Sequence, residues 1–185
     1  MLFRSEDRSP LDWNLLLANV SRGDAAIADA AVTAAVEAFP IWSGMSATER
    51  GVIMKRWADL VDANAARIAA VECLDMAMLE ESLRLRVIAR GARNLRAYAE
   101  LAEQYEERVW SSNGTHNRVV RMPAGPTVVI TPWNAPFMLS TWKCSPALAA
   151  GNTVILKPAE WSPLSCSLLA DLAHEAGVQI GRAHV

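Results

Sequence analysis

The first half of the chain carries apolar residues at a helical period, between polar positions that would face solvent. The run "GDAAIADAAVTAAVEAF" has apolar residues at helical spacing, at Ile27, Ala31, Ala34 and Ala38. It predicts a helix that either Asp24 or Ser21 caps and that Pro40 ends. A second helix should begin at "SATE", because Ser46 and Glu49 have the spacing of a capping box.

The apolar stripe of this second helix comprises Ile53, Trp57, Leu60 and Val61. After "DANA" the same period resumes at Ile68, Val71 and Leu74, and again from Leu83 to Leu101. We expect these helices to pack as an antiparallel layer, with their charged residues on solvated faces. None of them carries an obvious reactive group.

The pattern changes near Ser111. The segment "SSNGTHN" is rich in turn residues, and Asn113-Gly114 is its strongest turn signal. The next segment, "RVVRMPAG", alternates weakly and is interrupted by Pro123, which favours an edge strand or a short hairpin.

The remaining chain predicts strand, helix, strand and helix, over "TVVI", Pro136–Ala150, "NTVIL" and Pro163–Ala176. The two strands are continuous apolar runs, which is typical of strands buried on both faces of a parallel sheet. We expect Ser162 to cap the last helix, with Leu164, Leu168, Leu172 and Ala176 along one side. The predicted fold class is α/β, a helical layer followed by a βαβα unit of a Rossmann-like parallel sheet.

Composition excludes several classes of protein. The chain has 185 residues, 52% of them apolar, and a net charge of −2, so it is globular and has no basic surface for nucleic acid. No uninterrupted apolar run is long enough to span a bilayer. The three cysteines are too few and too scattered for a disulfide framework, which favours the cytoplasm. The three histidines show no metal-ligand spacing, so we predict no metal site.

Both predicted strands end in segments that combine prolines with a tryptophan and polar side chains, "TPWN" and "KPAEWSP". Ligands of open parallel sheets bind outside the carboxyl ends of the strands, so Trp133, Asn134, Lys157 and Glu160 should converge there. Prolines on both sides of Asn134 would hold its amide in place, as the stabilisation of a developing oxyanion requires. Lys157 and Glu160 offer a donor and an acceptor for ribose hydroxyls, and the carboxylate would favour NAD over NADP.

Each of these residues also has an ordinary structural interpretation. Asn134 could cap the helix that follows it. Lys157 alone would be a surface lysine that covers apolar neighbours, and Glu160 alone would be a solvated loop charge. Only their joint placement at two adjacent strand ends favours a functional site.

The segment "PWNAPFMLSTWKCSPALAAGNTVILKPAEWSPL" resembles the long signature of the aldehyde dehydrogenase superfamily. "AVEAFPIWSGMSATERGVIMKRWADLVDAN" is similar to the helical region upstream of that signature, and "HEAG" to the end of the following helix. The wording "WNAPFMLSTWK" most resembles the branch that acts on 5-carboxymethyl-2-hydroxymuconate semialdehyde and related hydroxymuconic semialdehydes. The resemblance identifies residues 6–179 as part of an NAD-binding domain, helical over about 22–110 and βαβα over about 118–179.

The resemblance implies roles for single residues. Asn134 would donate to the oxyanion that forms when a cysteine thiolate attacks the aldehyde. Lys157 and Glu160 would hold the adenosine ribose, and the wall of the NAD groove would be formed by Ile130, Thr131, Pro132 and Trp133. Lys143 would lie behind the site in a structural role. The full-length protein is expected to form a homo-oligomer and to oxidise an aldehyde with NAD.

Several family features are missing from the chain. Cys73, Cys144 and Cys166 do not match the nucleophile, and the family's general-base glutamate would lie further downstream, so we predict that the chain alone is inactive. The alternative is a non-catalytic α/β nucleotide-binding or assembly module. Where the family usually has a glycine-bearing turn, "LDMAMLEES" could extend a helix. We expect residues 1–5 and 180–185 to be non-native, because "LFRS" and "IGRAHV" match translated sequencing-library adapters.

Overall fold

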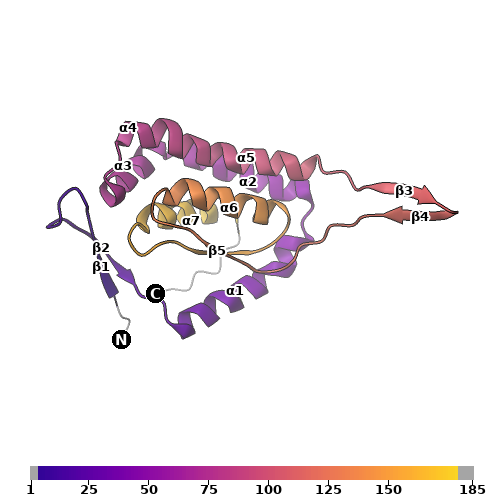
Figure 1. Cartoon of the computed structure of the whole chain (residues 1–185), viewed down its shortest axis with the longest axis horizontal. Helices are drawn as coiled ribbons and strands as arrows, with labels where there is room; N and C mark the ends of the chain where they lie inside the picture. Colours follow the sequence, from indigo (N-terminus) through magenta and orange to yellow (C-terminus); the bar gives the residue numbers. More distant parts are fainter. Residues whose placement is uncertain (1–3, 179–185) are drawn as a thin grey trace.

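The computed structural model describes residues 4–178 and has the α/β architecture that the sequence predicts (Figure 1). Its elements are β1 (Arg4–Arg8), β2 (Leu16–Ser21), α1 (Ala25–Gly44), α2 (Ala47–Ala63), α3 (Ala65–Met76), α4 (Glu80–Ser82), the π-helix η1 (Leu83–Ile88), α5 (Ala89–Glu103), β3 (Val109–Ser112), β4 (Thr115–Arg118), β5 (Thr127–Ile130), α6 (Pro136–Ala149), β6 (Val154–Lys157) and α7 (Leu164–Ala176). Helices α2 and α5 lie side by side as an outer layer, and α6 and α7 lie between this layer and the strands β5 and β6.

Helix α1 begins as the sequence predicts and ends later. The Asp24 carboxylate accepts a hydrogen bond from the Ile27 N–H at 3.0 Å and caps the helix. Pro40 does not end it, because the helix continues to Gly44. In length and composition α1 could cross a membrane, but one such helix near the N-terminus is weak evidence, because core helices of soluble proteins and signal sequences have the same length and composition.

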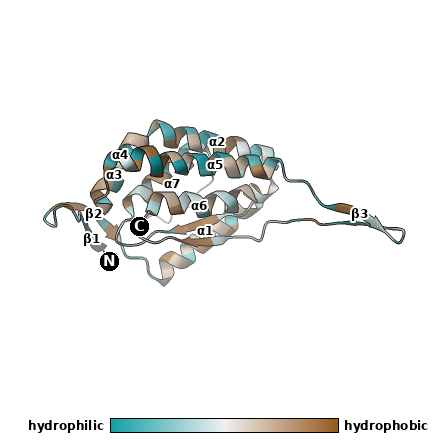
Figure 2. Cartoon of the chain, turned by 45° about the horizontal axis from the view of Figure 1, so that its top comes forward, coloured by the Kyte–Doolittle hydropathy of each residue, from teal (hydrophilic) through white to brown (hydrophobic). Residues whose placement is uncertain are grey.

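Helix α2 has both the predicted cap and the predicted inner face. Ser46 and Glu49 form the complete capping box. Trp57 and Val61 are buried, and the Trp57 indole donates a 3.2 Å hydrogen bond to the carbonyl oxygen of Leu169 on α7. Hydrophilic and hydrophobic residues alternate along α2 and α5, as expected for helices with one solvated face (Figure 2).

Helix α3 is rotated relative to the prediction. Of the expected stripe, Ile68 is buried, Val71 is half-buried and Leu74 is exposed. The inner face instead runs through Ile68, Ala69, Glu72 and Asp75. The apolar period missed this face because two of its positions carry carboxyl groups.

The chain turns directly after α3 instead of extending the helix. Met76 is the last helical residue, and Ala77 has a left-handed backbone with φ of 58°. The expectation that "LDMAMLEES" prolongs the helix is therefore wrong. The turn is kept, with alanine in a conformation that glycine adopts more readily.

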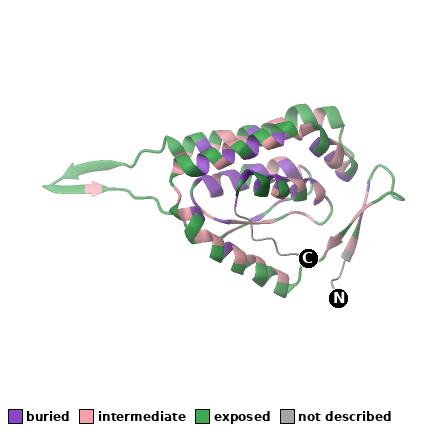
Figure 3. Ribbon diagram, turned by 180° about the vertical axis from the view of Figure 1, so that it is seen from behind, coloured by how far each residue is buried: buried purple, intermediate pink, exposed green. Residues whose placement is uncertain are grey.

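Strands β3 and β4 form a hairpin whose turn is Asn113-Gly114. Both residues have positive φ, as a two-residue hairpin turn requires, and β3 pairs antiparallel with β4 on either side. The predicted turn is confirmed, but "RVVRMPAG" forms no strand beyond Arg118. The hairpin projects from the body of the molecule and most of its residues are exposed (Figure 3).

Strands β5 and β6 pair in parallel with the predicted order, and α6 connects them. They are not buried on both faces. Val129 is buried, whereas Val128 and Ile130 point the other way and are 56% and 72% exposed. Continuous apolar runs predict that both faces of the β5–β6 sheet are covered, but the described residues cover only one of them.

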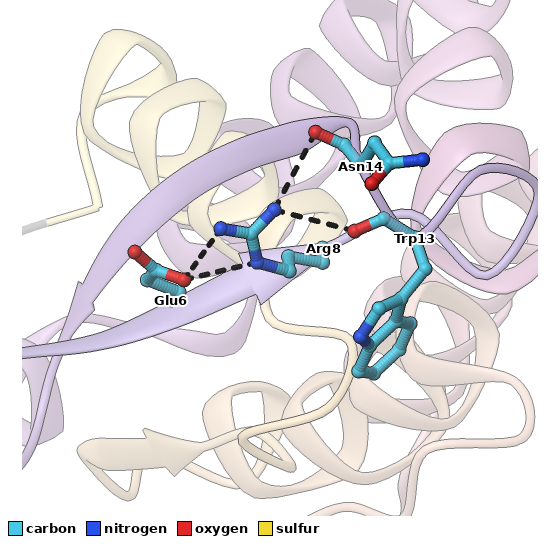
Figure 4. A network of polar contacts seen from close by, with 4 residues as sticks. All are labelled: Glu6, Arg8, Trp13 and Asn14. Carbon is cyan, nitrogen blue, oxygen red and sulfur yellow. Dashed lines mark hydrogen bonds and ion pairs between the residues drawn. The ribbon is translucent and has the colours of Figure 1, made fainter.

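Strand β1 pairs antiparallel with β2, whose sequence is "LLANVS", to form a hairpin at the start of the described chain. The Arg8 guanidinium closes its loop, with hydrogen bonds to the Glu6 carboxylate and to the carbonyl oxygens of Trp13 and Asn14 (Figure 4). Arg4 and Ser5, within the expected non-native end, lie in β1. The rest of the expected non-native ends, residues 1–3 and 180–185, lies outside the described residues.

Candidate functional site

The ends of β5 and β6 lie next to each other. Ile130 pairs with Lys157 in the parallel register, and the Thr131 N–H donates to the Lys157 carbonyl oxygen at 3.2 Å. The loops that carry Trp133 and Glu160 therefore leave the sheet at the same edge. This is where open parallel sheets bind ligands.

Lys157 and Glu160 form an exposed ion pair. The ammonium nitrogen lies 3.3 Å from a carboxylate oxygen, and the two side chains are 58% and 67% exposed. The pKa of the Glu160 carboxyl is below its usual value, first because its own backbone N–H donates to it and then because Lys157 does. An exposed pair of this kind contributes little to stability, so both groups can turn to a ligand at low cost.

The loop after β5 combines a buried beginning with an exposed end. Thr131 is 3% exposed, and its hydroxyl lies 3.3 Å from that of Ser140 on α6. Pro132, Trp133 and Asn134 are exposed. The loop is thus fixed at its base and presents an indole and a carboxamide to solvent.

Ser162 joins the two strand-end loops. Its hydroxyl donates a 3.1 Å hydrogen bond to the carbonyl oxygen of Trp133, and the residue is 1% exposed. The prediction that Ser162 caps α7 is wrong, because Pro163 occupies the N-cap position and no side chain of the helix's own start caps it. A serine before a proline looks like a cap in sequence, and only the fold shows its partner.

Asn134 does not cap α6. The N-cap residue is Ala135, which has no side-chain cap hydrogen bond. The interpretation of Asn134 as a helix cap is therefore not supported, and the exposed carboxamide remains available at the strand end.

Two carboxyl groups of α3, which the sequence did not single out, lie under the starts of α6 and α7. A carboxylate oxygen of Asp75 accepts a 3.1 Å hydrogen bond from the Leu164 N–H, the first of α7. The Glu72 carboxyl, fully buried, faces the Phe137 N–H near the start of α6 and the Ser165 hydroxyl near the start of α7. Within residues 4–178, neither Glu72 oxygen closes a hydrogen bond of ordinary geometry.

Burial dominates the electrostatics of this acidic group. Loss of solvent raises the pKa of Glu72 to about 7, against the opposing effects of Ser165 and Phe137. It also raises the pKa of Asp75 to about 7, to which the negative charges of Asp7 and Glu72 add. Asp7 of β1 is buried beside Asp75 and its pKa is raised, chiefly by burial.

Cys144 and Cys166 are structural residues in this fold. Both are buried, and burial raises the pKa of each thiol to about 12. The Cys166 sulfur lies 3.2 Å from the Ser140 hydroxyl. Since the thiolate is the nucleophile in cysteine chemistry, neither residue is suited to attack a substrate.

A shallow pocket lies elsewhere, between α3 and α7. Its lining residues are Asn64, Arg67, Ile68, Leu168, Asp171 and Leu172. None of them was predicted to be functional, and the pocket does not include the strand ends.

A match to a family model decides the affiliation of the chain. The model of the aldehyde dehydrogenase family matches residues 5–185. The chain belongs to the aldehyde dehydrogenase family. The resemblance inferred from "PWNAPFMLSTWK" and its surroundings is confirmed.

Individual relatives agree with this affiliation. The chain is 37% identical to the 5-carboxymethyl-2-hydroxymuconate semialdehyde dehydrogenase of Escherichia coli over 92% of the chain and 36% of that protein. It is 39% identical to the 2-hydroxymuconic semialdehyde dehydrogenase of Pseudomonas sp. (strain CF600) over 95% of the chain and 37% of that protein. It is also similar to the structure of PnpE in complex with nicotinamide adenine dinucleotide, with a TM-score of 0.92 and 35% identity, over 96% of this chain and 37% of that one. The chain thus spans little more than a third of the length of these relatives.

Proposed function

We propose that the chain provides the amino-terminal part of an NAD-dependent aldehyde dehydrogenase, with Asn134 as oxyanion donor and Lys157 and Glu160 as ribose ligands. The observation that carries this proposal is the junction of the two strand ends. Register, the Thr131 hydrogen bond and the Ser162 hydrogen bond bring Asn134 and the Lys157–Glu160 pair to one edge.

The residues at this edge fit a dinucleotide. Lys157 supplies a donor and Glu160 an acceptor for two ribose hydroxyls, and both are exposed. The exposed surfaces of Ile130 and Trp133 provide apolar wall for a planar ring system. Bound there, NAD would supply the hydride acceptor that aldehyde oxidation needs.

The part of Asn134 in the reaction follows from its chemistry. When a thiolate adds to an aldehyde, the carbonyl oxygen becomes an oxyanion, and a fixed amide donor stabilises that charge. Pro132 and Pro136 on either side, and the anchored carbonyl of Trp133, limit the motion of the donor. Removal of one such donor costs about 10²–10³ in rate.

We propose hydroxymuconic semialdehydes as the substrate class of the complete enzyme. Two relatives with 37% and 39% identity act, by their names, on such compounds. Purification of the enzyme encoded by the complete gene, and comparison of kcat/KM for 2-hydroxymuconic semialdehyde with that for a simple aliphatic aldehyde, tests this assignment. A preference for the aliphatic aldehyde would contradict it.

The 185-residue chain by itself should not oxidise aldehydes. Burial raises the pKa of the Cys144 and Cys166 thiols to about 12, and Cys73 is half-buried on α3. Incubation of the purified chain with NAD and an aldehyde should therefore produce no NADH. Turnover that survives Cys73→Ser would overturn the Asn134 assignment as well, since only the two buried thiols, Cys144 and Cys166, would be left and neither is suited to attack an aldehyde.

The alternative is a non-catalytic nucleotide-binding or assembly module. DNA downstream of the coding segment separates the two proposals. A continuous reading frame that encodes a cysteine nucleophile and a glutamate base supports the enzyme. Binding of NADH, measured by fluorescence, should weaken in Lys157→Ala and remain unchanged in Lys143→Ala.

A further inference from the structure

Arg90 on α5 lies over the indole of Trp142 on α6. The guanidinium carbon of Arg90 is 5.4 Å from the centre of the Trp142 ring, the geometry of a cation–π contact. A hydrogen bond joins the two helices beside this contact. The Asn94 carboxamide, one turn after Arg90, donates at 3.2 Å to the hydroxyl of Thr141, the neighbour of Trp142. Helix packing thus fixes where the cation and the indole meet.

The guanidinium of Arg90 keeps its hydrogen-bond donors free. Arg96, further along α5, forms ion pairs with Asp59 and Asp62 of α2. Arg90 is exposed, and within residues 4–178 its side chain forms neither an ion pair nor a hydrogen bond. The contact with Trp142 uses the face of the guanidinium, whereas its N–H donors lie in the plane of the group. They are available to a carboxylate, which arginine binds through two parallel N–H donors.

The outer face of α6 connects the strand-end site to this cation. Met138 and Leu139 on that face are half-buried, and Trp142 is 40% exposed. Residues three or four positions apart share one face of a helix, so these side chains form an apolar strip. At about 1.5 Å per residue, the strip extends about 9 Å from the start of α6, next to Asn134, to Trp142. A short carbon chain that begins at Asn134 can therefore lie along α6 and end near Arg90.

We propose that Arg90, supported by Trp142, binds a carboxylate at the far end of the aldehyde substrate and thereby selects aldehydes that carry one. The proposal rests on the proposed function, in which Asn134 stabilises the oxyanion at the near end. The N–H groups of Arg90 donate to the carboxylate, while the indole of Trp142 holds the guanidinium and packs against the carbon chain. Arg90 determines specificity and takes no part in the chemical step.

The ligand class is an unsaturated semialdehyde acid. A muconic semialdehyde has an aldehyde at one end of its carbon chain and a carboxylic acid at the other, and the acid is ionised at neutral pH. This is the arrangement that an amide donor and an unpaired guanidinium at the two ends of an apolar strip can bind.

Muconate, which has two carboxylates and no aldehyde, probes the site without catalysis. In nuclear magnetic resonance spectra of the 185-residue chain, muconate should shift the Trp142 indole N–H signal in a saturable manner. Arg90→Met keeps an apolar side chain over the indole and removes the charge, so it should weaken muconate binding by about 10–100-fold. Arg93→Met, at an exposed position of the same helix, should leave binding unchanged. No saturable shift at Trp142 in the wild type, or equal affinity in Arg90→Met, would overturn the proposal.

Kinetics of the enzyme encoded by the complete gene show whether the same contact selects the substrate. Arg90→Met should lower kcat/KM for 2-hydroxymuconic semialdehyde by about 10–100-fold more than kcat/KM for 2,4-hexadienal, which lacks the carboxylate. Arg90→Lys keeps the charge without the two parallel donors and should retain part of the preference. An equal loss for both aldehydes in Arg90→Met would contradict a role in selection.

NADH binding by the 185-residue chain reports separately on the strand-end site. Muconate binding that depends on Arg90, without NADH binding, would refute the nucleotide site and leave the carboxylate site standing. NADH binding that depends on Lys157, without muconate binding, would refute the role of Arg90 and leave the proposed function standing.

Discussion

The Ser162 hydroxyl donates a hydrogen bond to the carbonyl oxygen of Trp133, across 29 residues of sequence and between the two strand-end loops. This bond fixes the peptide unit that Trp133 shares with Asn134. The candidate site is therefore held together by a buried side chain that does not itself face solvent.

Ser162→Ala should loosen the edge of the sheet. Loss of the hydrogen bond should lower the free energy of unfolding by about 1 kcal/mol, and NADH affinity should fall because the two loops are no longer joined. Urea unfolding and fluorescence titration measure the two effects. Ser167→Ala, at an exposed position of α7, is the matched control and should change neither. Unchanged NADH affinity in Ser162→Ala would show that the loops keep their places without this bond.

Gly91→Ala should disturb the packing of α5 against Phe137 near the start of α6. A Cβ atom at Gly91 on α5 would lie 2.6 Å from the Phe137 ring, which is fully buried and cannot move freely. We expect a loss of about 1–3 kcal/mol in the free energy of unfolding, the usual cost of an overpacked core. Gly44→Ala at the end of α1 is the control, because a Cβ atom there meets nothing within 4 Å. Equal stabilities of the two variants would mean that α6 shifts without cost.

Ala77→Gly should stabilise the chain. Ala77 has φ of 58°, where an alanine side chain is strained and glycine is not. Relief of this strain, less the greater entropy of glycine in the unfolded chain, should raise the free energy of unfolding by about 0.5–1 kcal/mol. Ala66→Gly, at an exposed helical position of α3, should instead lower it by about 1 kcal/mol. A destabilised Ala77→Gly variant would contradict the left-handed turn.

Stability should fall as pH rises through the acid range. A carboxyl group whose folded pKa is raised contributes stability that is fully present below its unfolded pKa and lost up to its folded pKa. For Glu72 these limits are about 4.5 and about 7, which corresponds to a loss of about 3 kcal/mol between them. Asp75 should add a loss in the same direction, from 3.8 to about 7.

Urea unfolding at a series of pH values measures this loss. Glu72→Gln should flatten the dependence of the free energy of unfolding on pH between pH 4.5 and about 7. The free energy of unfolding of the variant should exceed that of the wild type most above that range. Glu100→Gln should follow the wild-type curve. Parallel curves for Glu72→Gln and the wild type would show that Glu72 does not titrate in this window.

The sequence predicted the elements whose signals are local. The capping box of Ser46 and Glu49, the Asn113-Gly114 turn and the strands at "TVVI" and "NTVIL" depend on neighbouring residues, and all four are present. The joint exit of the two strands at one edge also followed from sequence, because parallel strands bring their carboxyl ends together. The roles of Asn134, Lys157 and Glu160 remain predictions.

Tertiary structure alone decided which polar groups support that edge. Local pattern assigned Ser162 to a helix cap and Leu74 to a buried face, but Ser162 bonds Trp133 and α3 turns Glu72 and Asp75 inward. The physical reason is that the N–H groups at a helix start without a cap of its own can donate hydrogen bonds to acceptors on any element that packs against it. Hydrophobic periodicity assigns every carboxylate to the solvent-facing side of a helix. It therefore cannot identify a carboxyl group that is buried near the starts of two other helices.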